Sequence, residues 1–290
     1  MLEKLKLVYG QHIITKPSSD ENILWYQTDQ GEVFGVDPSQ LTHRETLLLN
    51  SFLKPIDPFN TLATDCEKSW YSYLFEDKSL PIIDSVQVHY FKMEHQPEQR
   101  QQIKEAVNGV FEGTQIVWTG AESAMMIQTN VSSDYGQQDI LLELSHAFTS
   151  DFLTDSIFFQ GQLHVPNDHL RTRLLKENQL FLRLIERGKL RSGVSSFYLS
   201  LPYLACYDSH ELTEAISDAF REAISDRDIV NTLSTYMRCN LNASQAAKAL
   251  YVHRNSLQYR IDKFIERTGI DIRHFSEASA AYFMMNLLNV

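Results

Sequence analysis

The spacing of hydrophobic residues predicts both strands and helices in the middle of the chain. Between residues 84 and 190, short stretches of alternating hydrophobic and polar residues are separated by longer stretches in which hydrophobic residues recur every three or four positions. The first period is typical of strands and the second of helices. The predicted order is strand, helix, strand, strand, helix, strand, helix. These elements cover residues 85–91, 97–111, 115–118, 123–129, 138–153, 156–165 and 168–187.

This order is typical of a split-βαβ domain. Such a domain contains an antiparallel sheet, and we expect its helices to lie on one face of that sheet. From residue 188 to 208 the pattern loosens, and we expect a connecting segment with a short helix. Helical periodicity then continues over residues 210–224, 227–239, 244–250, 253–267 and 276–289.

The N-terminal part also mixes strands and helices. Residues 23–36 predict two strands joined by a turn. Thr42 and Glu45 have the spacing of a capping box, in which the threonine side chain accepts from a backbone amide and the glutamate reaches back. A helix is expected to start there and to end near Pro55. Another is expected across 63–77, with its aromatic residues in the core. The predicted fold class is therefore α+β: a small α+β region, a split-βαβ centre and an all-α C-terminal part.

The composition is that of a globular protein, with 43% hydrophobic and 22% charged residues. At about 150 residues per domain, a chain of 290 residues predicts two domains or three. The three cysteines are far apart in the sequence, so we expect neither a disulfide framework nor a zinc site, and a reducing compartment. We find no signal peptide or membrane span. We therefore expect a soluble, cytoplasmic protein without a membrane partner.

Charge is distributed unevenly along this acidic chain. The net charge is −11, which taken alone argues against a nucleic-acid partner. Between Arg227 and His274, however, eight Lys or Arg stand against four Asp or Glu, so this segment carries +4 and the remainder −15. The asymmetry predicts a basic module on an acidic body.

The basic segment contains the pattern of a helix-turn-helix. Ser244 is expected to cap a short helix over 245–250, whose alanines let a second helix cross close by. Tyr251 and Val252 make the connection. Tyr251 stands where glycine is frequent, and a tyrosine is accommodated there if its backbone stays right-handed.

The second helix is expected to begin at His253 or Arg254 and to present DNA-reading side chains. Its buried side is expected to carry Leu257, Ile261, Phe264 and Ile265. Arginine pairs with guanine through two hydrogen bonds, and asparagine or glutamine does so with adenine. A plain helical hairpin with a solvated polar face would show a similar pattern.

We expect Arg254 and Asn255 to read bases in the major groove, and Lys263 and Arg267 mainly to contact phosphates. The full set of residues expected at double-stranded DNA is Ser244, Gln245, Lys248, His253, Arg254, Asn255, Ser256, Gln258, Tyr259, Arg260, Lys263 and Arg267.

The string AAKALYVHRNSLQYRIDKFIERTGIDI resembles the C-terminal helix-turn-helix of the PucR/CdaR-type regulators of purine catabolism, sugar diacids and similar pathways. HRNSLQYRI is its most specific part, and the resemblance covers residues 226–290. The preceding order of elements is similar to the degenerate cyclase-like (GGDEF-like) domain of that family. Where an active cyclase carries a Gly-Gly-Asp/Glu hairpin, this chain has Thr119-Gly120-Ala121-Glu122-Ser123. The closely placed carboxylates that Mg²⁺ requires are missing.

Together these observations predict four segments. They are an N-terminal α+β region of unassigned role (1–80), a degenerate cyclase-like domain (81–190), a helical connector (191–225) and a PucR-type helix-turn-helix domain (226–290). Two histidine pairs, His89 with His95 and His164 with His169, lack a supporting cysteine or carboxylate cluster, so we expect no metal. No cofactor is expected.

We expect a sequence-specific transcriptional regulator of bacterial type rather than an enzyme. A homodimer on two half-sites is expected, with the N-terminal two-thirds sensing a small-molecule effector or dimerising. Two alternatives remain open. A nucleotide-processing enzyme with a helical appendage requires carboxylates that converge near Glu122. A protein-interaction module requires an apolar surface on the C-terminal helices.

Overall fold

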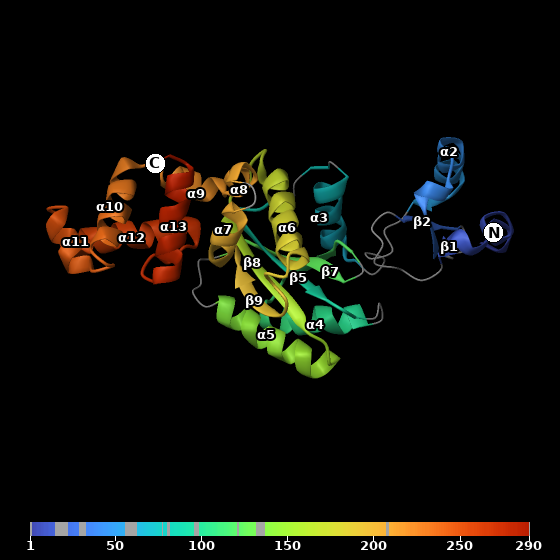
Figure 1. The fold of residues 1–290 in the computed structure, drawn as a ribbon, viewed down its shortest axis with the longest axis horizontal. Helices are drawn as coiled ribbons and strands as arrows, with labels where there is room; N and C mark the ends of the chain where they lie inside the picture. Colours follow the sequence, from blue (N-terminus) through green and yellow to red (C-terminus); the bar gives the residue numbers. More distant parts are fainter. Residues whose placement is uncertain are drawn as a thin grey trace.

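The computed structural model describes residues 2–14, 23–28, 33–55, 63–76, 78–79, 82–95, 99–120, 122–131, 137–206 and 209–289. In these ranges it shows a small N-terminal unit, a central sheet between helices, and a set of C-terminal helices (Figure 1). No helix in the described part of the chain has the length and hydrophobicity needed to span a bilayer.

The N-terminal unit is a four-stranded antiparallel sheet with two helices. The strand order is β1-β3-β2-β4. The bounds are α1 Leu2–Tyr9, β1 Ile13–Ile14, β2 Leu24–Gln27, β3 Val33–Val36, α2 His43–Phe52 and β4 Lys54–Pro55. The predicted pair of strands is confirmed, although the turn expected between them lies outside the described residues. The capping box of Thr42 and Glu45 is also confirmed.

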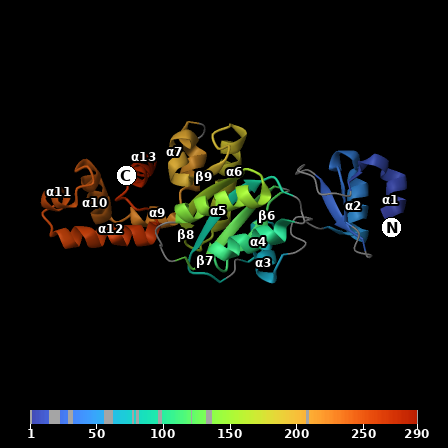
Figure 2. The ribbon, with the colours of Figure 1, turned by 90° about the horizontal axis from the view of Figure 1, so that it is seen from below.

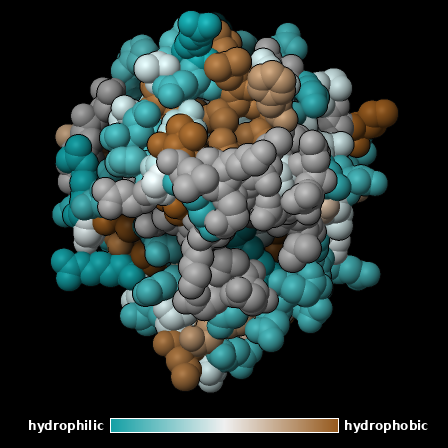
Figure 3. All heavy atoms as spheres, turned by 90° about the vertical axis from the view of Figure 1, so that its right-hand side faces the viewer, coloured by the Kyte–Doolittle hydropathy of each residue, from teal (hydrophilic) through white to brown (hydrophobic). Residues whose placement is uncertain are grey.

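The surface of α2 is unusually apolar. Leu47, Leu48 and Phe52 are exposed, whereas Leu49 on the same helix is buried in the small core of this unit. Figure 3 looks onto this end of the molecule, and hydrophobic side chains gather near its top, where Figure 1 places α2.

The central sheet has five strands in the order β6-β7-β5-β8-β9. The bounds are β5 Val86–Met93, β6 Gln115–Trp118, β7 Ser123–Thr129, β8 Ser156–His164 and β9 Gly193–Ser196. The predicted order over residues 84–190 is confirmed, and neighbouring strands run antiparallel except β9, which runs parallel to β8. β9 was not predicted, because its sequence GVSS contains one hydrophobic residue and no alternating pattern.

Helices cover both faces of this sheet (Figures 1 and 2). One face packs Phe91 and Phe158 against α4 (Arg100–Val110) and α5 (Gln137–Phe152). The opposite face packs Tyr90 and Phe159 against α3 (Asp65–Phe75) and α6 (Leu170–Glu186). The expectation of helices on one face is therefore wrong. Adjacent residues of a strand point to opposite faces, and β5 and β8 are buried at nearly every position, so both faces need cover.

The C-terminal helices are fixed to the sheet by a continuous hydrophobic core. Their bounds are α7 Phe197–Ala205, α8 Ser209–Ala215, α9 Asp218–Ala223, α10 Arg227–Arg238, α11 Ala243–Ala249, α12 Arg254–Thr268 and α13 Phe275–Leu287. One cluster of buried residues includes Trp70 and Phe181 beside the sheet, Phe220 in α9, and Phe264 and Met285 in α12 and α13. The domain limits drawn from the sequence stay a prediction.

The single helix predicted over 210–224 is divided into α8 and α9. The Ser217 side chain accepts a hydrogen bond from the Phe220 amide and begins α9 there. Arg173 of α6 holds this junction, because it donates to the Ile216 carbonyl and to the Asp218 carboxylate. The Ser217 backbone amide also donates to the side-chain oxygen of Gln162 in β8, at 3.0 Å.

A buried carboxylate lies directly behind this junction. Glu177 is fully buried. Its carboxylate accepts hydrogen bonds from the Tyr90 hydroxyl at 2.9 Å and from the Gln162 side-chain amide at 2.7 Å. His164 lies 3.1 Å from the same carboxylate. Gly161 makes room for it, since a Cβ atom there would lie 2.5 Å from a Glu177 oxygen. His164, considered above as a metal ligand, therefore belongs to a hydrogen-bonded core network.

Candidate nucleic-acid interface

The short helix α11 begins differently from the sequence prediction. Asn242, not Ser244, is its cap: the Asn242 side-chain oxygen accepts from the amides of Ser244 and Gln245, both at 3.1 Å. Asparagine and serine are equally good caps, so the sequence could not choose between them. Ala246 and Ala247 are buried against the neighbouring helices, as their small size allows.

The turn between α11 and α12 contains a tyrosine in an unfavourable conformation. The Val252 amide donates to the Ala247 carbonyl at 3.0 Å and the Tyr251 amide to the Lys248 carbonyl at 3.2 Å. These bonds close α11 only because Tyr251 adopts a φ of +54°. The condition stated above for a tyrosine at this position, a right-handed backbone, is not met, because the reverse turn after α11 requires a left-handed residue.

The long helix α12 presents a clear division between buried and exposed residues. His253 caps it, with Nδ1 accepting from the Asn255 amide at 3.2 Å, and Gly269 ends it. The four predicted core residues of this helix are confirmed as buried. They are Leu257, Ile261, Phe264 and Ile265.

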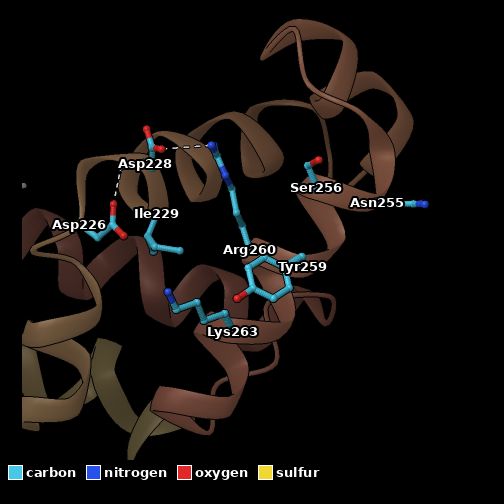
Figure 4. Close-up of a pocket in the computed structure, with 8 residues that line it drawn as sticks. All are labelled: Asp226, Asp228, Ile229, Asn255, Ser256, Tyr259, Arg260 and Lys263. Carbon is cyan, nitrogen blue, oxygen red and sulfur yellow. Dashed lines mark hydrogen bonds and ion pairs between the residues drawn. The ribbon is translucent and has the colours of Figure 1, made fainter.

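All twelve residues expected at DNA reach the surface of the helix-turn-helix, and nine of them are exposed. The half-buried ones are Gln258, Arg260 and Lys263. Arg254, Asn255 and Ser256 occupy the first turn of α12, and Figures 1 and 2 place this end of the helix away from the sheet. In the close-up, Asn255 points out into solvent (Figure 4).

Arg260 contacts the neighbouring helix α10. Its guanidinium lies 3.1 Å from the Asp228 carboxylate (Figure 4). It also donates to the Thr232 hydroxyl at 3.2 Å. Both partners belong to α10, so Arg260 fastens α12 to α10. A hollow of about 460 Å³ lies beside this contact, and Asn255, Tyr259 and Lys263 are among its lining residues.

Lys263 and Arg267 lie at the other end of α12, near the sheet. They line a hollow of about 580 Å³ together with Leu163 of β8. The same hollow is lined by the acidic residues Glu222, Asp262 and Glu266. The cations expected at phosphates are thus surrounded by carboxylates, unlike the first turn of α12.

Nearby, Asp271 anchors the loop between α12 and α13. Burial raises the pKa of Asp271, but hydrogen bonds from Arg273 outweigh burial and hold this pKa below its ordinary value. Arg273 also lies 3.8 Å from Asp262 on α12. The C-terminal half of α12 is therefore tied into an ionised network on its own protein.

The segment around Glu122, which the resemblance aligns with the hairpin of a cyclase, offers no comparable chemistry. Glu122 forms an ion pair with Lys92 at 3.7 Å. Within the ranges that the structure describes, no three His, Cys, Asp or Glu side chains are grouped as a metal site.

Comparison with known proteins places these features in context. The family described as "PucR C-terminal helix-turn-helix domain" matches residues 229–287. The "Uncharacterized protein YxkF" of Bacillus subtilis (strain 168) is 30% identical over 273 residues, which is 90% of each chain. A "Leucine-rich protein" of Streptococcus dysgalactiae subsp. equisimilis is 23% identical over 90% of this chain and 92% of its own. The "Carbohydrate diacid regulator" of Escherichia coli (strain K12) is 36% identical over 56 residues, 19% of this chain and 14% of its own.

Proposed function

The chain belongs to the same family as YxkF and carries a PucR C-terminal helix-turn-helix domain, and on this basis we propose that it regulates transcription by binding specific DNA sequences as a homodimer. It is a transcriptional regulator of the PucR type and not an enzyme. In this proposal Arg254 and Asn255 contact bases in the major groove. The protein acts in the cytoplasm. The central sheet and the N-terminal unit sense a small molecule or hold the dimer together.

One observation carries this proposal. The first turn of α12 exposes Arg254, Asn255 and Ser256, while the next residue, Leu257, is completely buried. A helix that is anchored by its core face and free at its polar N-terminal end is what entry into a major groove requires. A protein-interaction module would instead expose an apolar surface there.

Charge limits how much of α12 meets the DNA. Asn255, Tyr259, Asp262 and Glu266 follow one another at helical spacing along its outer side. The first two are uncharged and the last two are acidic, so this outer side approaches the bases closely only near its N-terminal end, and Lys263 and Arg267 remain for phosphates. We therefore place base reading in the first two turns.

DNA fragments selected from a random library by the full-length protein test this proposal. A consensus sequence is expected, with an affinity that falls steeply as salt rises, because phosphate contacts release counterions. Arg254→Ala or Asn255→Ala is expected to cost about 1–3 kcal/mol and to blur the sequence preference. Lys263→Ala or Arg267→Ala is expected to weaken binding to all DNA sequences alike.

Lys68→Ala is the matched control, since it removes an exposed cation from α3. Selection of no consensus, or binding that ignores salt, contradicts the proposal. If the two pairs of variants behave alike on mutated operators, the assignment of α12 to the major groove is wrong.

A further inference from the structure

Tyr251 holds a backbone conformation that glycine adopts without strain. Its φ of +54° places it in the left-handed region, directly after α11. A side chain with a Cβ is disfavoured there, because the Cβ crowds the neighbouring carbonyl oxygen. The position therefore costs the folded protein stability as long as it carries a tyrosine.

Nothing in the described part of the chain compensates for this cost. The Tyr251 side chain is 97% exposed. Neither its ring nor its hydroxyl has a hydrogen bond, ion pair or ring contact among the described residues. An aromatic ring in water contributes no burial, so the free protein gains nothing from the tyrosine.

The location of Tyr251 connects it to the proposed function. It lies two residues before His253, the cap of α12, and three before Arg254. This turn is at the end of the molecule that points away from the sheet (Figure 1). A duplex that receives the first turn of α12 in its major groove carries a sugar–phosphate strand past this turn.

We propose that Tyr251 is a further DNA-contacting residue that lies against the sugar–phosphate backbone at the edge of the major groove. Its ring packs on deoxyribose, and its hydroxyl donates to a phosphate oxygen. Tyrosine hydroxyls are among the groups that make such contacts, which position the protein without reading sequence. The inference rests on the proposed function, because it needs α12 to be the reading helix.

A second residue provides a matched control. Leu153, at the end of α5, has a φ of +55° and is 89% exposed. It shares the backbone conformation and the exposure of Tyr251 but lies outside the helix-turn-helix. Glycine at either position relieves the same backbone strain, so only a DNA contact separates the two variants.

The experiment measures thermal unfolding and Kd for Tyr251→Gly, Tyr251→Phe, Leu153→Gly and Arg254→Ala. The probes are the fragment selected by the unmodified protein and a scrambled duplex of equal length. Tyr251→Gly is expected to raise the Tm and yet to weaken binding to both duplexes about tenfold. Tyr251→Phe is expected to lose about threefold in affinity for both duplexes, because only the hydrogen bond of the hydroxyl is removed. Leu153→Gly is expected to raise the Tm and leave both Kd values unchanged.

Unchanged DNA binding by Tyr251→Gly overturns the inference, and so does a loss confined to the selected sequence. The proposed function fails separately, through Arg254→Ala retaining full sequence preference. Failure of the unmodified protein to select any fragment from the library overturns both.

Discussion

His89 shows how strongly burial acts on a single side chain in this protein. It lies within the central sheet, with Nε2 3.0 Å from the Gln128 side-chain oxygen and its ring against Phe111. Burial lowers the pKa of His89 from 6.5 to about 4, against the opposing effect of Gln128. The imidazole is therefore neutral in the folded protein at neutral pH.

The depressed pKa of His89 predicts a loss of stability in mild acid. The unfolded chain takes up the proton as the pH falls below about 6.5, whereas the folded chain does so only near 4. The stability contributed by the neutral ring is complete above 6.5 and is lost as the pH falls toward 4. Between pH 7 and pH 5 we expect a decrease of about 2 kcal/mol in the free energy of unfolding from this residue.

Urea unfolding at both pH values measures this decrease. His89→Gln removes the titrating group and leaves Gln128 a polar partner. The free energy of unfolding of this variant is therefore expected to fall by about 2 kcal/mol less than that of the unmodified protein between pH 7 and pH 5. An identical pH dependence in the variant would show that His89 is not the titrating group.

At the scale of elements, α12 depends on α10 for its position. Arg260 reaches from one helix to both Asp228 and Thr232 of the other. Its side chain is half-buried, while Asp228 is mostly exposed to solvent, which weakens the ion pair. We therefore assign Arg260 a positioning role in addition to its expected place at DNA.

Arg260→Ala is expected to lower the free energy of unfolding by about 1 kcal/mol. It is also expected to weaken binding to all DNA sequences alike, because the whole reading helix loses support. A double-mutant cycle with Asp228→Asn measures the coupling between the two side chains. Additive effects of the two substitutions would show that the ion pair does not hold the helix.

The elements that carried their own local signals were predictable from the sequence. The capping box at Thr42 and the hydrophobic spacing of Leu257, Ile261 and Phe264 are examples. Features set by the folded environment were not. The left-handed backbone of Tyr251 follows from the turn that α11 makes, and the edge strand β9 forms only because β8 lies beside it. For the same reason, the contacts of Arg260 with α10 could not be read from its place in the motif.

At the scale of the whole molecule, the net charge of −11 sets a condition on dimerisation. Two acidic copies repel each other, so a stable pair needs contact through surface that carries little charge. The exposed residues Leu47, Leu48 and Phe52 of α2 provide such a surface, and we expect it to contact a second copy.

Light scattering on the purified protein is expected to give the mass of a dimer. Phe52→Asp is expected to shift the mass toward the monomer, since it places a carboxylate inside the contact. Val110→Asp on α4 changes another exposed apolar residue and is expected to leave the mass unchanged. A dimer that survives Phe52→Asp would exclude α2 as the contact.

Trp70 and Met285 share one hydrophobic core, although they come from opposite parts of the described chain. A ribosome releases residues in order from the N-terminus, so the apolar faces of α7 and α8 that pack against α13 stay uncovered until α13 has emerged. A chain whose synthesis stops early keeps these faces in water, where they attract proteases or aggregate. We therefore expect unfinished subunits to be removed, so that chains without the proposed DNA-binding helices do not accumulate.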